Sequence, residues 1–159
     1  MIIDTLITDR TQADVEYVKS LTLKWLNGTI TNTEKAEWLA GLKGAYNYTD
    51  LNRVGEAVAY VANMLNQTGR SVSVIAKQNW TVADIPSTAQ MTSFLNDLTL
   101  LKNNVDGVTL NTPSTMDNLN YQTANLIEQI ILACYNSIIR ERADSEICGV
   151  AICGVEGVL

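Results

Sequence analysis

The apolar residues of this chain recur mainly three and four positions apart, which is the spacing of amphipathic helices. The clearest stripe covers residues 51–65, where Leu and Val return at helical spacing between polar residues. Thr49 precedes this stripe with a side chain suited to capping, and Gly69 follows it. We therefore predict a helix between these two positions and a mainly helical fold.

Capping boxes predict two earlier helices, because a Thr in each is followed three positions later by an acidic residue. Thr11 with Asp14 begins a helix that we expect to end near residue 28. Thr31 with Glu34 begins the next, and Gly44 is its natural stop.

The second half of the chain is predicted to alternate helices with irregular segments. Residues 71–74 alternate Ser and Val, which favours a short half-exposed strand. Pro86 and Ser87 begin a fourth helix, whose buried face runs as far as Leu101. Residues 103–120 are rich in Asn, Thr, Asp and Gly, and are predicted to form a long loop.

The fifth helix, predicted over about residues 121–142, is apolar on nearly its whole circumference. Glu128 is one of the few polar residues that interrupt it. A helix of this kind is either central in its own domain or shared with a second subunit. We predict that Ile131, Cys134 and Ile138 lie in such a buried contact interface.

Residues 147–159, ICGVAICGVEGVL, form an imperfect repeat with a single charge and no helical stripe. They are predicted to be an extended strand that needs a neighbour, with interface contacts at Val150, Ile152 and Val155. The predicted fold is mainly α: a bundle of about five helices with a short β segment and an extended C-terminal strand. We divide it into a helical domain over residues 1–146 and an extended apolar attachment segment over residues 147–159.

Charge and hydropathy exclude several classes of partner. The chain has 11 basic and 17 acidic residues, a formal net charge of −6 and no basic cluster, so we expect no nucleic-acid binding. Its apolar runs are shorter than the ~20 residues that span a bilayer, so we expect no membrane insertion. The N-terminus lacks the pattern of a secretory signal, which favours synthesis in a cytoplasm.

Candidate chemistry is sparse. The chain has no His, so it has no Ser–His or Cys–His nucleophile and no imidazole metal ligand. Cys134, Cys148 and Cys153 are expected to serve as small apolar packing residues. We expect no catalytic residue, no metal and no cofactor.

Two pairs of carboxylates are acid–base candidates. Glu34 and Glu37 lie one helical turn apart, and Asp144 and Glu146 follow the fifth helix. Surface solvation and helix-start electrostatics explain both pairs better. The aromatic residues could form a carbohydrate or partner platform, but a core or subunit-contact role is favoured. These residues are Trp25, Trp38, Trp80, Tyr46 and Tyr48.

Three stretches carry a resemblance to a known family. They are residues 4–15, the string EKAEWLAGLKGAYNYTDLNRVGEAV, and NWTVADIPSTAQM. Together they resemble small phage and prophage minor structural proteins of the tail, baseplate or fibre region, over about residues 4–140. The C-terminal ICGVAICGVEGVL departs from that pattern.

The resemblance implies a non-enzymatic virion protein that is made in the host bacterial cytoplasm. Its partners would be other virion structural proteins and further copies of itself. No catalytic motif of the family maps onto this chain. Two alternatives stay open: a carbohydrate-binding module for host recognition, and a small cell-wall hydrolase that uses Glu34 or Glu37.

Overall fold

The computed structural model describes residues 1–117 and 119–153, with side chains as far as residue 145. This part of the chain is mainly helical and contains no strand. Its elements are the 3-10 turn η1 (Ile2–Thr5) and the helices α1 (Gln12–Leu26), α2 (Asn32–Ala40), α3 (Tyr48–Gln67), α4 (Thr88–Asn103) and α5 (Tyr121–Cys153).

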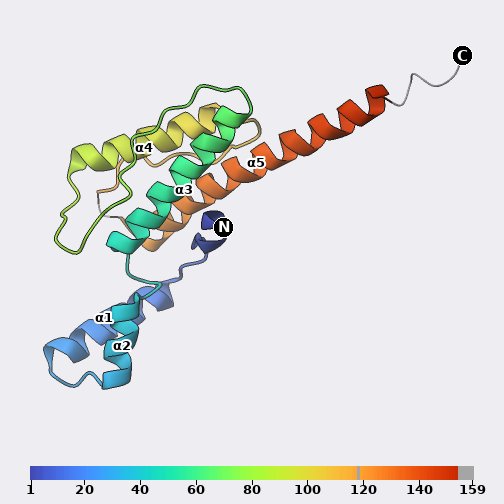
Figure 1. Cartoon of the computed structure of the whole chain (residues 1–159). Coiled ribbons are helices and arrows are strands. Elements are labelled where there is room, and N and C mark those ends of the chain that lie inside the picture. The colour runs from blue at the N-terminus through green and yellow to red at the C-terminus, as the bar shows by residue number, and fades with distance from the viewer. Residues whose placement is uncertain (118, 154–159) are drawn as a thin grey trace, which may run out of the picture.

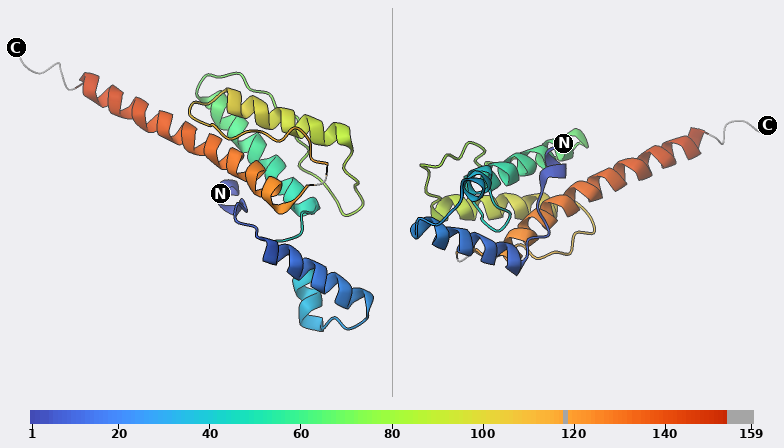
Figure 2. Two further views of the ribbon diagram at one scale, coloured as in Figure 1. Left: turned by 180° about the vertical axis from the view of Figure 1, so that it is seen from behind. Right: turned by 90° about the horizontal axis from the view of Figure 1, so that it is seen from below.

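The helices form two parts of very different character (Figure 1). α3, α4 and α5 pack on one another as a three-helix bundle, and η1 lies on α3. α1 and α2 form a hairpin that projects from one end of this bundle, and we call residues 11–41 the arm (Figure 2). The long α5 leaves the bundle in a different direction (Figures 1 and 2).

The bundle core confirms the apolar stripe that the sequence predicts for the third helix. Val54, Val58, Val61 and Leu65 are all fully buried there. They pack with buried residues of α4 and α5 in one continuous cluster. Fully burying a Val or Leu side chain contributes about 1.5–3 kcal/mol, so this cluster is the main source of the bundle's stability.

The apolar α5 is central in its own domain along its first half. Ile131, Cys134 and Ile138 are each 0 % exposed and belong to the bundle core. A helix that is apolar all round can be central in its own domain or shared with a second subunit. At these three positions, packing within the domain accounts for the apolar residues. A second subunit can reach them only if the bundle opens.

The predicted strand over residues 71–74 does not form, because this segment is irregular. The alternation is real, since Val72 is buried and the Ser on each side is exposed. However, Val72 pairs with a side chain instead of a strand: its N–H donates to Asn66 Oδ1 at 2.7 Å, and its carbonyl accepts from Asn66 Nδ2 at 2.9 Å. Period-two patterning thus identified the inward side chain but not its backbone partner.

The predicted extended C-terminal strand is wrong for residues 147–153, because α5 continues to Cys153. Helix propagation adds one hydrogen bond per residue, so a helix already formed extends readily into a following apolar segment. One Gly in the path costs only about 1 kcal/mol relative to Ala. Val150 and Ile152 therefore lie in a helix, whereas Val155 lies outside the described residues.

Several helix boundaries follow the predicted caps. Thr11, Thr31 and Ser87 each cap a helix in a complete capping box. The predicted stop at Gly44 is wrong, because α2 ends at Ala40 and the turn is made by Gly41 at a φ of 96°. α3 is likewise capped by Asn47, not by Thr49.

Gly55 generates a prediction about packing, because α3 passes close to the segment between α3 and α4 at this position. A Cβ atom here would lie 2.4 Å from the Lys77 carbonyl oxygen. Gly→Ala inside a helix normally gains about 1 kcal/mol, but forcing the two backbones apart costs about 1–3 kcal/mol. We expect Gly55→Ala to lower the free energy of unfolding in urea, whereas the neighbouring exposed Glu56→Ala should change it little. A stabilised Gly55→Ala protein would contradict this packing.

Candidate functional site

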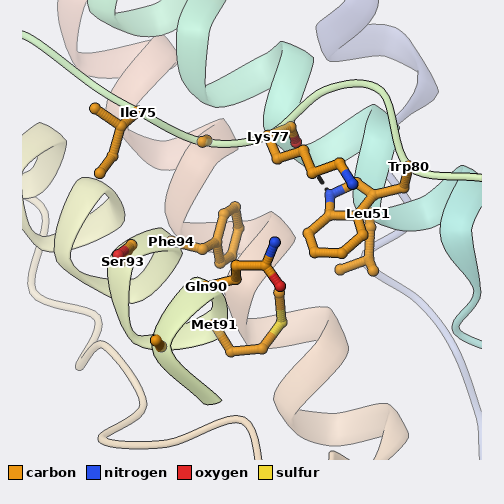
Figure 3. Close-up of a pocket in the computed structure, with 10 residues that line it drawn as sticks. Leu51, Ile75, Lys77, Trp80, Gln90, Met91, Ser93 and Phe94 are labelled. Atoms are coloured by element: carbon orange, nitrogen blue, oxygen red, sulfur yellow. Dashed lines mark hydrogen bonds between the residues drawn. The ribbon is translucent and has the colours of Figure 1, made fainter. Parts of the chain in front are cut away.

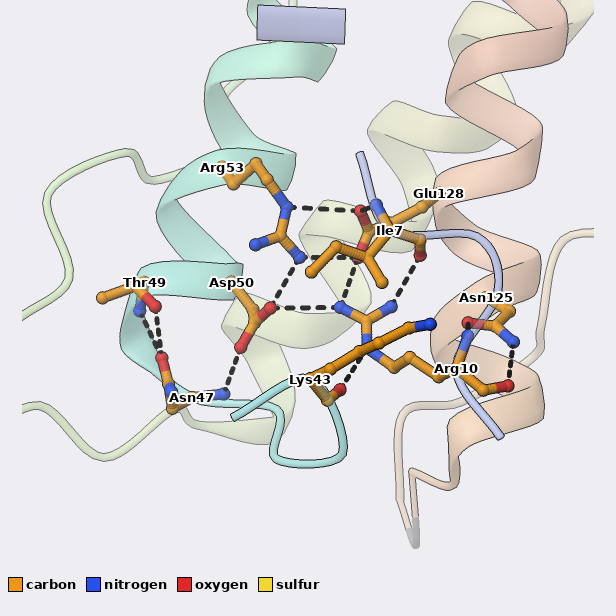
Figure 4. Close-up of polar contacts among 9 residues, drawn as sticks. All are labelled: Ile7, Arg10, Lys43, Asn47, Thr49, Asp50, Arg53, Asn125 and Glu128. Atoms are coloured by element: carbon orange, nitrogen blue, oxygen red, sulfur yellow. Dashed lines mark hydrogen bonds and ion pairs between the residues drawn. The ribbon is translucent and has the colours of Figure 1, made fainter. Parts of the chain in front are cut away.

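A cluster of four charged side chains joins the arm to the bundle (Figure 4). Arg10 Nη2 donates to Glu128 Oε1 at 2.7 Å and to Asp50 Oδ1 at 3.1 Å. Arg53 Nη2 donates to the same two oxygens, at 2.8 Å and 2.6 Å respectively. Arg10, Asp50 and Glu128 are buried, and a buried charge is strongly destabilising unless an opposite charge lies beside it. We call Arg10, Asp50, Arg53 and Glu128 the ion cluster.

Each member of the ion cluster comes from a different part of the fold, except that Asp50 and Arg53 share α3. Glu128 lies in α5, where it is fully buried and also accepts the Ile7 N–H at 2.5 Å. Asp50 lies in the first turn of α3, where it stabilises the helix N-terminus. Its Oδ2 accepts the Asn47 N–H at 2.9 Å.

Arg10 binds both segments that connect the arm to the bundle. Its Nη1 donates to the Ile7 carbonyl at 2.7 Å, in the segment that enters the arm. Its Nε donates to the Lys43 carbonyl at 3.1 Å, in the segment that leaves it. Its backbone is also paired with the Asn125 side chain, at 3.0 Å and 2.8 Å. One guanidinium therefore fixes both ends of the arm to α3 and α5.

The protonation chemistry of the ion cluster favours a structural role. Burial alone would lower the pKa of Arg53, but the hydrogen bonds to Glu128 and Asp50 outweigh it and raise that pKa. All four carboxylate oxygens accept from an arginine or a backbone amide. None of them is therefore free to take a proton from a substrate.

Tyr46 packs against the ion cluster instead of joining an exposed aromatic platform. The Arg10 guanidinium carbon lies 5.3 Å from the centre of its ring. Its hydroxyl is enclosed and has no hydrogen-bond partner. Burial, and then the negative charges of Glu128 and Asp50, raise the pKa of this hydroxyl. Trp80 is also buried, and its indole N–H donates to the Lys77 carbonyl at 3.1 Å.

The arm is held together mainly by contacts near its surface. Glu34 of α2 pairs with Lys24 of α1, and the Tyr17 hydroxyl donates to Glu37 at 2.5 Å. Leu21 is the only fully buried side chain of the two helices. Glu34 and Glu37, which the sequence offers as an acid–base pair, thus connect α1 to α2.

Exposed apolar and aromatic residues remain on the arm. Trp25 and Trp38 form a tilted pair with ring centres 6.3 Å apart. Leu26 and Leu39 are 75 % and 79 % exposed.

A second candidate site is a small pocket beside the segment 70–87, which connects α3 to α4 and which we call the crossover. The pocket has a volume of about 290 Å³, and we call it the crossover pocket. Trp80, Phe94 and Met91 supply much of its apolar wall (Figure 3). Lys77 stands at its edge, with its amine 4.3 Å from the centre of the Trp80 ring.

The residues predicted for an interface are not brought together at one surface. Ile131, Cys134 and Ile138 are in the core, and burial raises the pKa of the Cys134 thiol to about 11. Val150 and Ile152 lie farther along α5. Asp144, in the same helix, is exposed.

The cluster of Arg10, Asp50, Arg53 and Glu128 was not predicted from the sequence. The available signal was Glu128, a charged residue inside an otherwise apolar helix, since such a residue requires a buried partner. Its partner Arg10 lies far away in the sequence, so no local pattern connects the two.

Comparisons with known proteins identify no family for this chain. The chain matches no family model, no curated protein and no solved structure. Within the described residues, no group of three or more Cys or acidic side chains could hold a metal ion. In the same part of the chain, no helix is both long and apolar enough to cross a membrane.

The ion cluster predicts that loss of a single partner is costly. Glu128→Gln preserves the shape of the side chain but leaves two arginines facing one carboxylate. We expect the free energy of unfolding to fall by roughly 3–5 kcal/mol, measured in urea. As a control, Arg70→Met removes the half-exposed pair between Arg70 and Glu141 and should cost no more than about 1 kcal/mol. If the two variants lower the free energy of unfolding equally, the buried ion cluster stabilises the fold no more than a half-exposed ion pair does.

The ion pair between Lys24 of α1 and Glu34 of α2 predicts that the stability of the fold depends on pH. The hydrogen bond from Lys24, followed by that from the Thr31 backbone, lowers the pKa of Glu34 from 4.5 to about 2. A lowered pKa stabilises the fold fully above pH 4.5, and this stabilisation is lost as the pH falls through about 2. Carboxyl NMR titration of Lys24→Met should show the Glu34 pKa raised towards 4.5. Lys35→Met is the control, because Lys35 lies in α2 beside Glu34. It should leave the pKa of Glu34 unchanged.

Proposed function

We propose that this protein is a non-enzymatic structural component of a phage or prophage virion, associated with the tail, baseplate or fibre. It acts by binding neighbouring virion proteins and further copies of itself. The virion assignment is supported by the resemblance of about residues 4–140 to minor structural proteins. The assembly role is supported independently by the shape of the molecule.

The projecting end of α5 carries this proposal. The helix has 33 residues and is therefore about 50 Å long. Its last described tie to α3 is made by Arg142, whose Nη2 donates to the Met64 carbonyl at 3.2 Å. Beyond this point α5 extends away from the bundle (Figures 1 and 2). The residues in its final turns, 147–153, include no charged residue.

An uncharged apolar helix end that stands away from its own domain favours burial against another chain. Soluble proteins rarely leave large contiguous apolar surfaces in contact with water. The corrected helical conformation also changes the expected mode of attachment. A helix packs its apolar side against other helices or into a groove, whereas the extended strand expected from the sequence would have paired with a sheet edge.

The arm provides a second projection that supports a binding role. Its direction relative to the bundle is set by Arg10 and the ion cluster, so it is a preorganised part. The pair of the exposed Trp25 with the half-buried Trp38 keeps carbohydrate recognition as a second candidate, because sugars stack on aromatic faces. Trp80 is buried in the bundle region and takes no part in that candidate site. The hydrolase alternative has less support, since Glu34 and Glu37 are both engaged between helices.

Removal of residues 147–159 tests the proposal. The bundle ties end near Arg142, so the shortened chain should keep its melting temperature and its helical circular dichroism, apart from the lost turns. In phage carrying the shortened gene, the protein should be missing from gradient-purified particles by mass spectrometry. The full-length double variant Ile147→Glu with Val150→Glu is the matched control for chain length, and should be missing too.

Two results would contradict the proposal. If the wild-type chain is absent from purified particles, the virion assignment is wrong. If the shortened chain is incorporated as well as the wild type, the end of α5 is not the attachment element.

A further inference from the structure

We propose that two copies of this chain pair through their α5 helices, which run antiparallel and cross close to Ala143. This inference rests on the assembly role proposed above, where further copies of the chain are among the partners, and it specifies that contact. It is carried by three observations: an exposed side of α5, the order of charges along that helix, and the room around its projecting end.

One side of α5 faces away from the bundle in the second half of the helix. Asn136, Ile139 and Ala143 are exposed and follow one another at helical spacing, so they lie on one side, with the exposed Arg140 beside them. Ile139 is exposed to 42 %, which is unusual for a large apolar side chain next to the fully buried Ile138. This outward side of α5 is therefore open to a second helix.

The second half of α5 contains one block of charged residues between two uncharged stretches. The block is residues 140–146, RERADSE, and its middle residue is Ala143. Residues 133–139 before it and residues 147–153 after it contain no charged residue. When two such helices run antiparallel and cross at Ala143, the uncharged end of each lies beside the uncharged stretch that precedes the block in the other. The helix is therefore complementary to a second copy of itself, as a twofold contact requires.

The order of charges within the block favours the antiparallel direction. Glu141 and Arg142 bind groups at the end of α3 and just after it, so they are already engaged within the chain. Arg140 and Asp144 lie one helical turn apart, and both are exposed. In an antiparallel pair, Arg140 of each copy comes beside Asp144 of the other. In a parallel pair, like charges would meet at both positions, which disfavours that direction.

The projecting end of α5 leaves room for this arrangement. Beyond Arg142 the helix extends away from the bundle (Figures 1 and 2). The paired segment, residues 133–153, is about 30 Å long. The antiparallel direction places the two bundles at opposite ends of this segment, which keeps two chains of net charge −6 apart. Each uncharged helix end is thus covered by the other copy without bringing the two acidic bundles together.

The helix pair is expected to be a weak dimer. Exposed ion pairs contribute little each, and a contact between two single helices is at the low end of interface sizes. We expect a dissociation constant between about 1 and about 100 micromolar. A contact of this strength becomes firm when it acts together with the other contacts of an assembly.

Charge reversal on the full-length chain tests the pairing. Sedimentation velocity with a reducing agent present should show a monomer–dimer equilibrium of the wild type that depends on concentration. Arg140→Glu alone and Asp144→Arg alone should each raise the dissociation constant about tenfold, because both ion pairs of the dimer become repulsive. An equimolar mixture of the two variants should form a heterodimer about as tight as the wild-type dimer, because both pairs are attractive again.

Lys19→Glu and Glu16→Arg on the arm are the matched controls, because both residues are exposed and the changes in net charge are the same. They should leave the dissociation constant unchanged, and all variants should keep the wild-type melting temperature. A wild type that stays monomeric up to about millimolar concentration would overturn the inference. So would single variants that dimerise as tightly as the wild type, or a mixture that dimerises no better than either variant alone. If the wild type is monomeric but removal of residues 147–159 still excludes the chain from phage particles, the proposed function stands and the end of α5 binds a different virion protein.

Discussion

A carboxylate inside an apolar helix dictates how the parts of this molecule meet. Glu128 is fully buried in α5, and an unpaired charge there would destabilise the folded state by several kcal/mol. It is stable because Arg10 and Arg53 reach it from the arm connection and from α3. Asp50 balances the second positive charge. The direction of the arm relative to the bundle is therefore set by electrostatic pairing, whereas the bundle itself is held by apolar packing.

Side chains replace regular secondary structure in the connections of this fold. Asn52 and Asn66 pair with the crossover backbone much as a neighbouring strand would, and Arg10 does the same for the segments around the arm. Buried backbone amides and carbonyls need such partners. Long irregular connections can consequently be held in one fixed arrangement, as the crossover is.

The described part of the molecule combines the three-helix bundle with three outward features: the arm, the end of α5 and the crossover (Figure 1). This distribution is suited to a protein that contacts several neighbours. Glu34, Glu37, Asp50 and Glu128 are each engaged in structural bonds. The proposed assembly role uses the surfaces that remain, and the small size of each fits contacts that become strong only when several act together.

Local features of the fold could be predicted from the sequence. The caps at Thr11, Thr31 and Ser87 and the apolar stripe of α3 could be predicted, because capping and helical periodicity involve residues within a few positions of one another. Which chain segment covers α5 could be learned only from the three-dimensional arrangement. That arrangement also decided the pairing of Arg10 with Glu128 and the use of Asn66 in place of a strand, because these partners are brought together by the fold. The end of α5 was mispredicted for a related reason: the pattern of residues 147–153 is ambiguous on its own, and the helix that precedes it determines its conformation.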